Sequence, residues 1–162
     1  RVIAAASSDE KLTFIEQAGP DELLNYGDGE LKEKVKALTD GKGADVIYDP
    51  VGGDLFDQAT RCINWNGRLL VVGFTSGRIP NYPANLALLK GSSMVGVFLG
   101  RFRKEEPEAY EQNFQELLQM YSDGKIRPIV TQTYPFEDFE SAFNVFKERR
   151  VMGKVTLTIR QE

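Results

Sequence analysis

The residues best suited to hold a charged ligand follow the first apolar segment of the chain. Ser7 and Ser8 come directly after that segment, and Lys11 follows about one helical turn later. Two hydroxyl groups, a helix N-terminus and an ammonium group together suit a phosphate group. The same residues also suit a plain helix start, in which Ser8 caps the helix and Lys11 is exposed to solvent. This loop alone leaves both interpretations open.

Three later loops carry glycine, which lets a ligand approach the backbone closely. Each follows an apolar segment, and their sequences are Pro50-Val51-Gly52-Gly53, Gly73-Phe74-Thr75-Ser76-Gly77 and Phe98-Leu99-Gly100. In a sheet of parallel strands such loops meet at one edge, where ligands bind. Glycine after a strand is first of all a turn signal, so each of these loops taken alone is a weak indication of a site.

Alternating apolar and amphipathic segments must position these loops. The apolar segments predict strands at Val2–Ala6, Glu22–Asn25, Ala44–Asp49, Arg68–Val72, Ser92–Leu99, Ile129–Tyr134 and Lys154–Ile159. The amphipathic segments predict helices after Ser8, between Leu31 and Leu38, and at Leu55–Ile63, Asn85–Leu89, Glu105–Ser122 and Phe136–Arg149. The alternation over residues 1–125 predicts an α/β fold with a doubly wound parallel sheet, and residues 126–162 are expected to form a separate attachment.

The composition excludes several kinds of site. The 162 residues include no histidine and one cysteine, Cys62, and the net charge is −4. A Cys/His zinc site, a Ser-His-Asp triad and a disulfide framework cannot form within these residues. The net negative charge indicates no basic surface for nucleic acid. No apolar run reaches the ~20 residues that span a bilayer. We therefore expect no metal, nucleic-acid or membrane partner, a cytoplasmic location, and a buried, apolar role for Cys62.

Seven segments in chain order carry a family resemblance. They are Ala5–Leu12, Leu24–Tyr26, Gly43–Gly53, Asn66–Phe74, Gly91–Val97, Gly124–Pro128 and Met152–Val155. Together they resemble the zinc-independent medium-chain dehydrogenase/reductases, in the NADPH:quinone oxidoreductase branch. The resemblance implies a fragment: residues 1–125 would be part of a Rossmann domain without its first strand and glycine-rich loop. Residues 126–162 would be the C-terminal return segment of a GroES-like domain.

The resemblance also implies NADPH as the cofactor and assigns residues to it. In the family, the residues that match Ser7, Lys11 and Tyr26 bind the 2′-phosphate. This favours phosphate binding by the first loop, and we count Ser8 among the cofactor-binding residues. The cofactor cleft would be lined by Val51, Gly73, Phe74 and Thr75. The nicotinamide would be approached by Phe98, Leu99 and Gly100, and Arg150 would lie near the edge of the cofactor.

The activity that the resemblance implies is hydride transfer to a quinone or a similar enone, with the catalytic residues unassigned. One alternative is a 2-enoyl thioester reductase of the same superfamily. Another is a non-catalytic NADPH-binding or structural module. The residues named above do not choose among these three.

Two expectations concern the sheet itself. Ser92–Leu99 is apolar on both faces and should form an edge strand, so we expect a homodimer that pairs these edges, with a monomer as the alternative. In the usual order of this fold, the first strand lies between the second and the fourth. Without it, the sheet should have a gap between Val2–Ala6 and Ala44–Asp49.

Overall fold

The computed structural model describes residues 1–159. The chain forms two compact units, Arg1–Arg101 and Phe102–Glu162. The sequence predicts a division of another kind, into a Rossmann-type domain (1–125) and a C-terminal return segment (126–162). That division stays a prediction. Residues 160–162 of its second range lie outside the described residues.

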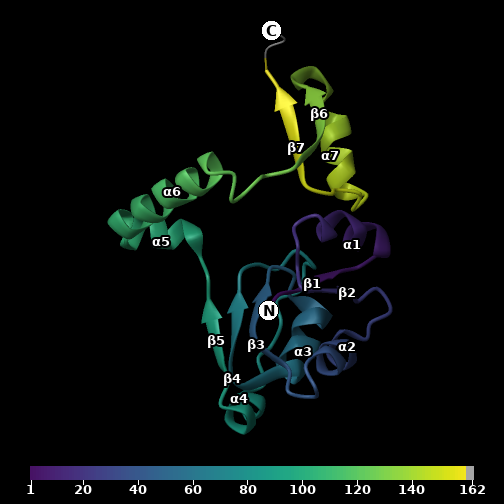
Figure 1. The fold of residues 1–162 in the computed structure, drawn as a ribbon, viewed down its shortest axis with the longest axis vertical. Coiled ribbons are helices and arrows are strands. Elements are labelled where there is room, and N and C mark those ends of the chain that lie inside the picture. The colour runs from purple at the N-terminus through teal and green to yellow at the C-terminus, as the bar shows by residue number, and fades with distance from the viewer. Residues whose placement is uncertain (160–162) are drawn as a thin grey trace. The chain divides into compact units, whose positions relative to one another are not determined.

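The first unit alternates strands and helices in the order that the sequence predicts (Figure 1). Its strands are β1 (Ile3–Ala6), β2 (Glu22–Asn25), β3 (Ala44–Asp49), β4 (Ile63–Val71) and β5 (Ser93–Gly96). Its helices are α1 (Asp9–Glu16), α2 (Leu31–Leu38), α3 (Gly53–Cys62) and α4 (Ala84–Lys90). All of its strand pairs are parallel, which confirms the predicted α/β class.

The five strands of this unit form two separate sheets. β1 pairs with β2, and β3, β4 and β5 form a second sheet in that order. β1 and β3 are therefore unpaired with each other, which confirms the expected gap. In the second sheet Ile47 is aligned with Leu69, and Leu70 with Val95, so β4 is central and β5 lies at one edge.

Helix α3 connects the two parts of the core. Phe56 and Ala59 are buried with Leu69 of β4, whereas Cys62 is buried with the cluster that includes Leu24. The spacing of three residues places Phe56, Ala59 and Cys62 on one face of the helix, as an amphipathic helix requires. Burial raises the pKa of the Cys62 thiol to about 11, so this cysteine is the buried, apolar residue that was expected.

Several boundaries differ from the prediction. β4 begins at Ile63 rather than at Arg68, so Ile63 is a strand residue and not the end of the predicted helix Leu55–Ile63. β5 ends at Gly96, so the predicted strand Ser92–Leu99 is too long, and Leu99 instead begins α5 (Leu99–Glu105). An apolar run does not by itself distinguish the end of a strand from the start of a helix. The predicted helix Glu105–Ser122 is interrupted at Glu106, because a residue before proline disfavours helical geometry.

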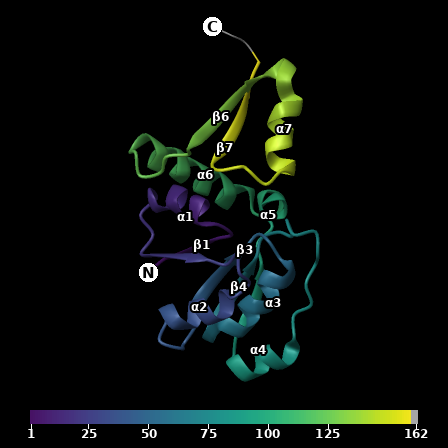
Figure 2. The same cartoon turned by 90° about the vertical axis from the view of Figure 1, so that its right-hand side faces the viewer.

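The second unit contains α6 (Pro107–Ser122), β6 (Val130–Pro135), a 3₁₀ turn (Phe136–Asp138), α7 (Phe139–Lys147) and β7 (Lys154–Thr158). β6 and β7 pair in parallel, and α7 runs alongside them (Figure 2). The buried residues of α7 are Ala142 and Val145. Within residues 1–159, no helix is long and apolar enough to cross a membrane.

Candidate functional site

The first loop folds as a capped helix start. Ser8 has extended backbone angles, and its Oγ accepts the backbone N–H of Lys11 at 3.4 Å. The hydroxyl proton of Ser8 remains a donor, because this bond uses only a lone pair. The cap therefore exists and still leaves Ser7, Ser8 and the Lys11 ammonium as groups that a phosphate can use.

The end of β2 lies directly against this loop. The N–H of Tyr26 donates to the carbonyl oxygen of Ala6 at 2.9 Å. A Cβ on Gly27 would lie 2.5 Å from the carbonyl oxygen of Ser7, so the two backbones are in contact. The structure thus brings the segments that contain Ser7 and Tyr26 together, and the part that these residues take in a phosphate site stays a prediction.

One acidic side chain in this region, that of Asp9, bonds to the end of β2. The Asp9 carboxyl accepts the side-chain N–H of Asn25 at 2.6 Å, and the Asn25 Oδ1 accepts the N–H of Gly27. These bonds hold an acid beside the ends of β1 and β2. The sequence contains no local signal for this contact, because Asp9 and Asn25 are sixteen residues apart.

Hydrogen bonds join the loops after β3 and β4 into one surface, which we call the ledge (residues 50–53 and 73–77). Thr75 donates its N–H to the Pro50 carbonyl at 3.2 Å, and Ser76 donates to the Val51 carbonyl at 3.0 Å. A Cβ on Gly73 would lie 3.2 Å from the Pro50 oxygen. These contacts bring together the four residues assigned to the cofactor cleft, which are Val51, Gly73, Phe74 and Thr75.

Two glycines make this close packing possible. Gly52 and Gly53 have φ values of +70° and +60°, which L side chains rarely adopt. A Cβ on Gly53 would lie 2.7 Å from the Ser76 Oγ, and one on Gly52 would lie 3.0 Å from the Phe74 ring. Glycine is therefore required where the α3 N-terminus meets the ledge.

Arg78 links the ledge to α3 through ion pairs and a backbone hydrogen bond. Arg78 contacts Asp54 at 2.9 Å and Asp57 at 2.5 Å, and its carbonyl accepts the N–H of Gly53 at 3.2 Å. The hydrogen bond that Arg78 donates to the Asp57 carboxylate raises the pKa of the Arg78 guanidinium. These side chains are solvent-exposed, so we regard the contacts as fixing loop position rather than as a large source of stability.

Asp49 anchors the turn at the end of β3. It is only 6% exposed, and its Oδ1 accepts the N–H groups of Val51 at 2.8 Å and Gly52 at 3.0 Å. Within the described residues its Oδ2 has no hydrogen-bond partner. Sequence reasoning missed this residue, although an Asp that begins a turn after a strand is a known signal for such a side-chain cap.

The end of β5 leads into the residues assigned to the nicotinamide. The N–H of Val97 donates to the Val71 carbonyl at 2.8 Å, and Phe98 follows with 73% of its surface exposed. Leu99 and Gly100 lie in the first turn of α5. This corrects the expected strand, which was to end at Leu99, and the expected loop, which was to contain Gly100.

Arg150 lies in the second compact unit, after the end of α7. Its guanidinium pairs with Glu148, with Nε 2.6 Å from Oε2. The other assigned residues, from Ser7 to Gly100, belong to the first unit. The part that Arg150 takes in a cofactor site stays a prediction.

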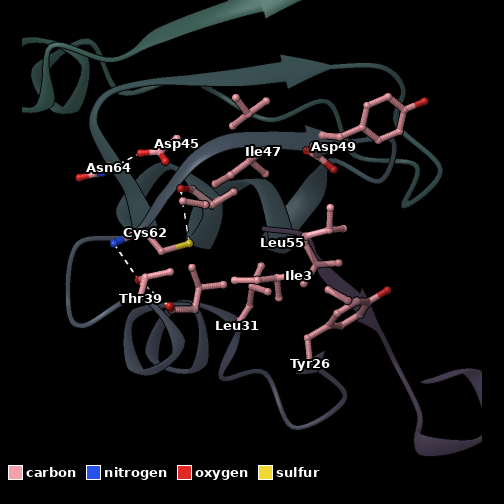
Figure 3. Close-up of a pocket in the computed structure, with 18 of the residues that line it drawn as sticks. Ile3, Tyr26, Leu31, Thr39, Asp45, Ile47, Asp49, Leu55, Cys62 and Asn64 are labelled. Carbon is pink, nitrogen blue, oxygen red and sulfur yellow. Dashed lines mark hydrogen bonds between the residues drawn. The ribbon is translucent and has the colours of Figure 1, made fainter. Parts of the chain in front are cut away.

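A cavity of about 880 Å³ is lined by residues of β1, β3, α2 and α3. Tyr26 and Asp49 line one end of it, and Cys62 and Asn64 line the other (Figure 3). Tyr48 and Val51 also line the cavity. Of the residues assigned to the cofactor, Tyr26 and Val51 line this cavity.

Comparison with known proteins identifies the family. The family model described as zinc-binding dehydrogenase matches residues 1–122. Quinone oxidoreductase-like protein 2 from Bos taurus is 39% identical over 160 residues, which is 99% of this chain. The chain belongs to the medium-chain dehydrogenase/reductases, in their quinone oxidoreductase branch. It spans 46% of that bovine relative and 44% of the Nematostella vectensis homologue, which is 37% identical over 160 residues.

Solved structures of this family have the same fold. An NAD-dependent alcohol dehydrogenase is 31% identical, with a TM-score of 0.85, over 99% of this chain and 44% of its own. A mycobacterial protein solved with NADPH is 26% identical, with a TM-score of 0.85, over 97% and 48%. Quinone oxidoreductase from Escherichia coli, also solved with NADPH, is 25% identical, with a TM-score of 0.83, over 96% and 48%.

The sequence of this chain offers no Cys/His ligand set for the zinc named in the description of the matching family. The sequence has no histidine, and its single cysteine is buried. Among residues 1–159, no group of three or more Cys, Asp or Glu side chains is placed to hold a metal ion. The residues present do not fit a Cys/His zinc site.

Proposed function

We propose that this chain carries the cofactor-binding part of an NADPH-dependent oxidoreductase that transfers a hydride to a quinone or a similar enone. The observation that carries the proposal is the contact between the ends of β1 and β2, in which Tyr26 bonds to Ala6 and Gly27 packs against Ser7, the residue before the Ser8 cap. Two relatives of this fold were solved with NADPH, which supports the same cofactor here. The single buried cysteine suits a reducing, cytoplasmic compartment.

The residues present fit such a cofactor. Ser7, Ser8 and Lys11 would bind the 2′-phosphate at the start of α1, where the helix dipole favours an anion. The glycines of the ledge leave its backbone open to close approach by the cofactor. The bound cofactor would supply the hydride, while the apolar side chains of Phe98 and Leu99 would exclude water from the transfer.

The preference for NADPH over NADH is argued from the tip of β1. Sheets that bind NAD usually place an acid there, which binds the ribose 2′-hydroxyl. Here Ser7 follows β1, and the nearest acid, Asp9, is engaged with Asn25. One solved relative is described as NAD-dependent, so the residues of this tip, rather than the family, carry the proposed preference.

Lys11→Ala tests the 2′-phosphate site. In a protein that carries this chain at the length of its relatives, the change should weaken NADPH binding by about 1–3 kcal/mol, the range for a charged hydrogen bond. NADH binding should stay nearly unchanged, and Lys147→Ala on α7 serves as a matched surface control. Calorimetric dissociation constants check this, and equal losses for both cofactors would reject the 2′-phosphate role.

A homodimer through β5 belongs to the same proposal. β5 lies at the sheet edge within the described residues, and Met94, Val95 and Val97 are each at least 40% exposed. An exposed apolar edge strand pairs readily with a second copy, and two-fold pairing closes the assembly. A monomer remains the competing outcome.

Val95→Lys tests this interface in the protein at the length of its relatives. A charge in the middle of the edge strand should convert the dimer to a monomer, because paired edges would bury it without a partner. Leu88→Lys on α4, where Leu88 is 81% exposed, adds the same charge away from the edge and should leave the dimer intact. Light scattering decides the matter, and a wild-type protein that is already monomeric at micromolar concentration would contradict the interface.

Reduction of an activated enoyl compound is the second candidate activity. Prostaglandin reductase-3 from Mus musculus is 34% identical over 135 residues, although the match covers 34% of that protein. Its name describes a reductase of a substrate other than a quinone. Steady-state rates with benzoquinone and with an enoyl thioester, measured side by side on the longer protein, distinguish the two candidates.

A further inference from the structure

Asp49 lies at the end of β3 (Figure 3), and its carboxylate bonds to the turn that follows. Its Oδ1 accepts the N–H groups of Val51 and Gly52, at 2.8 Å and 3.0 Å. Within the described residues its Oδ2 has no hydrogen-bond partner, so these two bonds are the hydrogen bonds of this buried side chain. The carboxylate therefore fixes the orientation of two successive peptide groups, Pro50–Val51 and Val51–Gly52.

The opposite ends of the same two peptide groups hold the second loop of the ledge. The Pro50 carbonyl accepts the backbone N–H of Thr75 and also its hydroxyl group, each at 3.2 Å. The Val51 carbonyl accepts the N–H of Ser76 at 3.0 Å. Each peptide group thus has its N–H on Asp49 and its C=O on the loop after β4. A chain of hydrogen bonds polarises its members, so the carboxylate strengthens the bonds at the far end.

These bonds give the hydroxyl group of Thr75 a defined polarity. Its proton is donated to the Pro50 carbonyl, so the hydroxyl oxygen can only accept further hydrogen bonds. Thr75 is an exposed residue, which leaves its side chain within reach of a ligand. A hydroxyl group without such a partner would rotate freely and would have to be ordered when the ligand binds. Thr75 therefore offers a ligand an acceptor that is already oriented.

The position of this acceptor on the sheets indicates which part of a dinucleotide it meets. The proposed 2′-phosphate site lies at the ends of β1 and β2, whereas Thr75 follows β4 of the other sheet. In folds of this kind a dinucleotide lies across the carboxyl ends of the strands, with one mononucleotide on each half. The half opposite the 2′-phosphate is the nicotinamide riboside. It carries ribose hydroxyl groups and a carboxamide NH₂, which are donors that such an acceptor can bind.

We propose that Asp49 is a positioning residue for the cofactor, which holds Thr75 so that its hydroxyl oxygen accepts a hydrogen bond from the nicotinamide riboside half of NADPH. This role rests on the proposed function and adds to it a residue that does not itself touch the cofactor. Asp49 acts through the two peptide groups, because it is only 6% exposed and its bonded oxygen faces the backbone. A plain cap of the turn would stabilise the fold without a specific effect on one half of the cofactor.

Two ligands separate the halves of the site in a protein that carries this chain at the length of its relatives. NADPH has both halves, whereas adenosine 2′,5′-bisphosphate has the 2′-phosphate but no nicotinamide riboside. Asp49→Ala removes both bonds to the turn and should weaken NADPH binding roughly tenfold, with the bisphosphate changed by less than about twofold. Asp49→Asn keeps Oδ1 as an acceptor and should restore NADPH binding to within about threefold of the wild type. Calorimetry gives all of these dissociation constants.

Thr75→Val tests the acceptor itself, and this test remains if Asp49→Ala fails to fold. The change removes the hydroxyl group but keeps the shape of the side chain, and it should weaken NADPH binding roughly tenfold. Thr75→Ser keeps the hydroxyl group and should bind NADPH like the wild type. In the double variant Asp49→Ala/Thr75→Val the loss should be smaller than the product of the two single losses, because both changes act on one hydrogen bond. Losses that simply multiply would overturn the link between the two residues.

The 3-acetylpyridine analogue of NADPH identifies the donor, because a methyl group replaces its carboxamide NH₂. If the carboxamide is the donor, Thr75→Val should not weaken binding of the analogue. If a ribose hydroxyl is the donor, the roughly tenfold loss should persist with the analogue. NADPH binding that is equal in Thr75→Val and the wild type would overturn the acceptor role with either donor.

Lys11→Ala keeps this test separate from the test of the proposed function. It should weaken both NADPH and the bisphosphate, because both ligands carry the 2′-phosphate, and an effect on neither would reject the phosphate site itself. If Lys11→Ala weakens both ligands while Asp49→Ala weakens them equally, or leaves NADPH unchanged, the role of Asp49 is overturned and the phosphate site stands. The role of Asp49 is also overturned if Asp49→Asn binds NADPH as weakly as Asp49→Ala, since the retained acceptor then has no effect.

Discussion

Gly43→Ala should lower the free energy of unfolding of the 162-residue chain by about 3 kcal/mol. Gly43 directly precedes β3, is buried, and has φ +95°. A Cβ at this position would overlap the carbonyl oxygen of Cys62 at the end of α3. The obstacle is backbone rather than the end of a flexible side chain, so either the start of β3 or the end of α3 would have to move.

A glycine two residues earlier supplies the matched control. Gly41 has φ +79°, but a Cβ there would meet nothing within 4 Å. Gly41→Ala therefore has only the cost of a left-handed backbone, about 1–2 kcal/mol. Urea denaturation followed by circular dichroism measures both variants. Equal losses would show that the contact between Gly43 and Cys62 does not constrain the fold.

The effect matters for the site because Gly43 sets the position of β3. Its N–H donates to the Thr39 hydroxyl at 2.9 Å, which ties the strand to the end of α2. The same strand carries Asp49 at its other end, and Asp49 holds the turn of Val51. A displaced β3 would therefore also displace the wall of the proposed cofactor cleft.

The elements of the first unit were largely predictable because each carries a local signal. Ser8 predicts the start of α1, and the alternation of apolar and amphipathic segments predicts the order of β1 to β5. Glu22–Asn25 and Ala44–Asp49 match the observed strands residue for residue. The end of β5 was not predictable, because Val97, Phe98 and Leu99 continue an apolar run that serves a strand and a helix equally well.

The candidate site was predictable as a set of loops but not as a set of contacts. Glycine after a strand indicated the ledge, whereas the bonds from Arg78 to Asp54 and Asp57 join positions more than twenty residues apart. The unpaired oxygen of Asp49 is visible only once the burial and partners of the side chain are known. The chemistry of a residue is therefore present in the sequence, but its surroundings depend on the packing of distant segments.

The 162-residue chain by itself should show no measurable oxidation of NADPH by benzoquinone. The proposed phosphate site lies on the β1–β2 sheet, and the ledge lies on the β3–β4–β5 sheet. No ladder of hydrogen bonds joins the two sheets within the described residues, so strand pairing does not hold the two halves of the cofactor site in register. A misplacement of about 1 Å between reacting groups can reduce a rate by about 10²-fold.

The measurement follows NADPH absorbance with and without the chain, because quinones also oxidise NADPH slowly on their own. A protein that carries the chain at the length of its relatives is the positive control, and it should turn over under the same conditions. Turnover that increases with the concentration of the 162-residue chain and disappears in its Lys11→Ala variant would contradict the expectation. It would mean that the packing of α2 and α3 around the cavity fixes the two sheets well enough for hydride transfer, without a strand between β1 and β3.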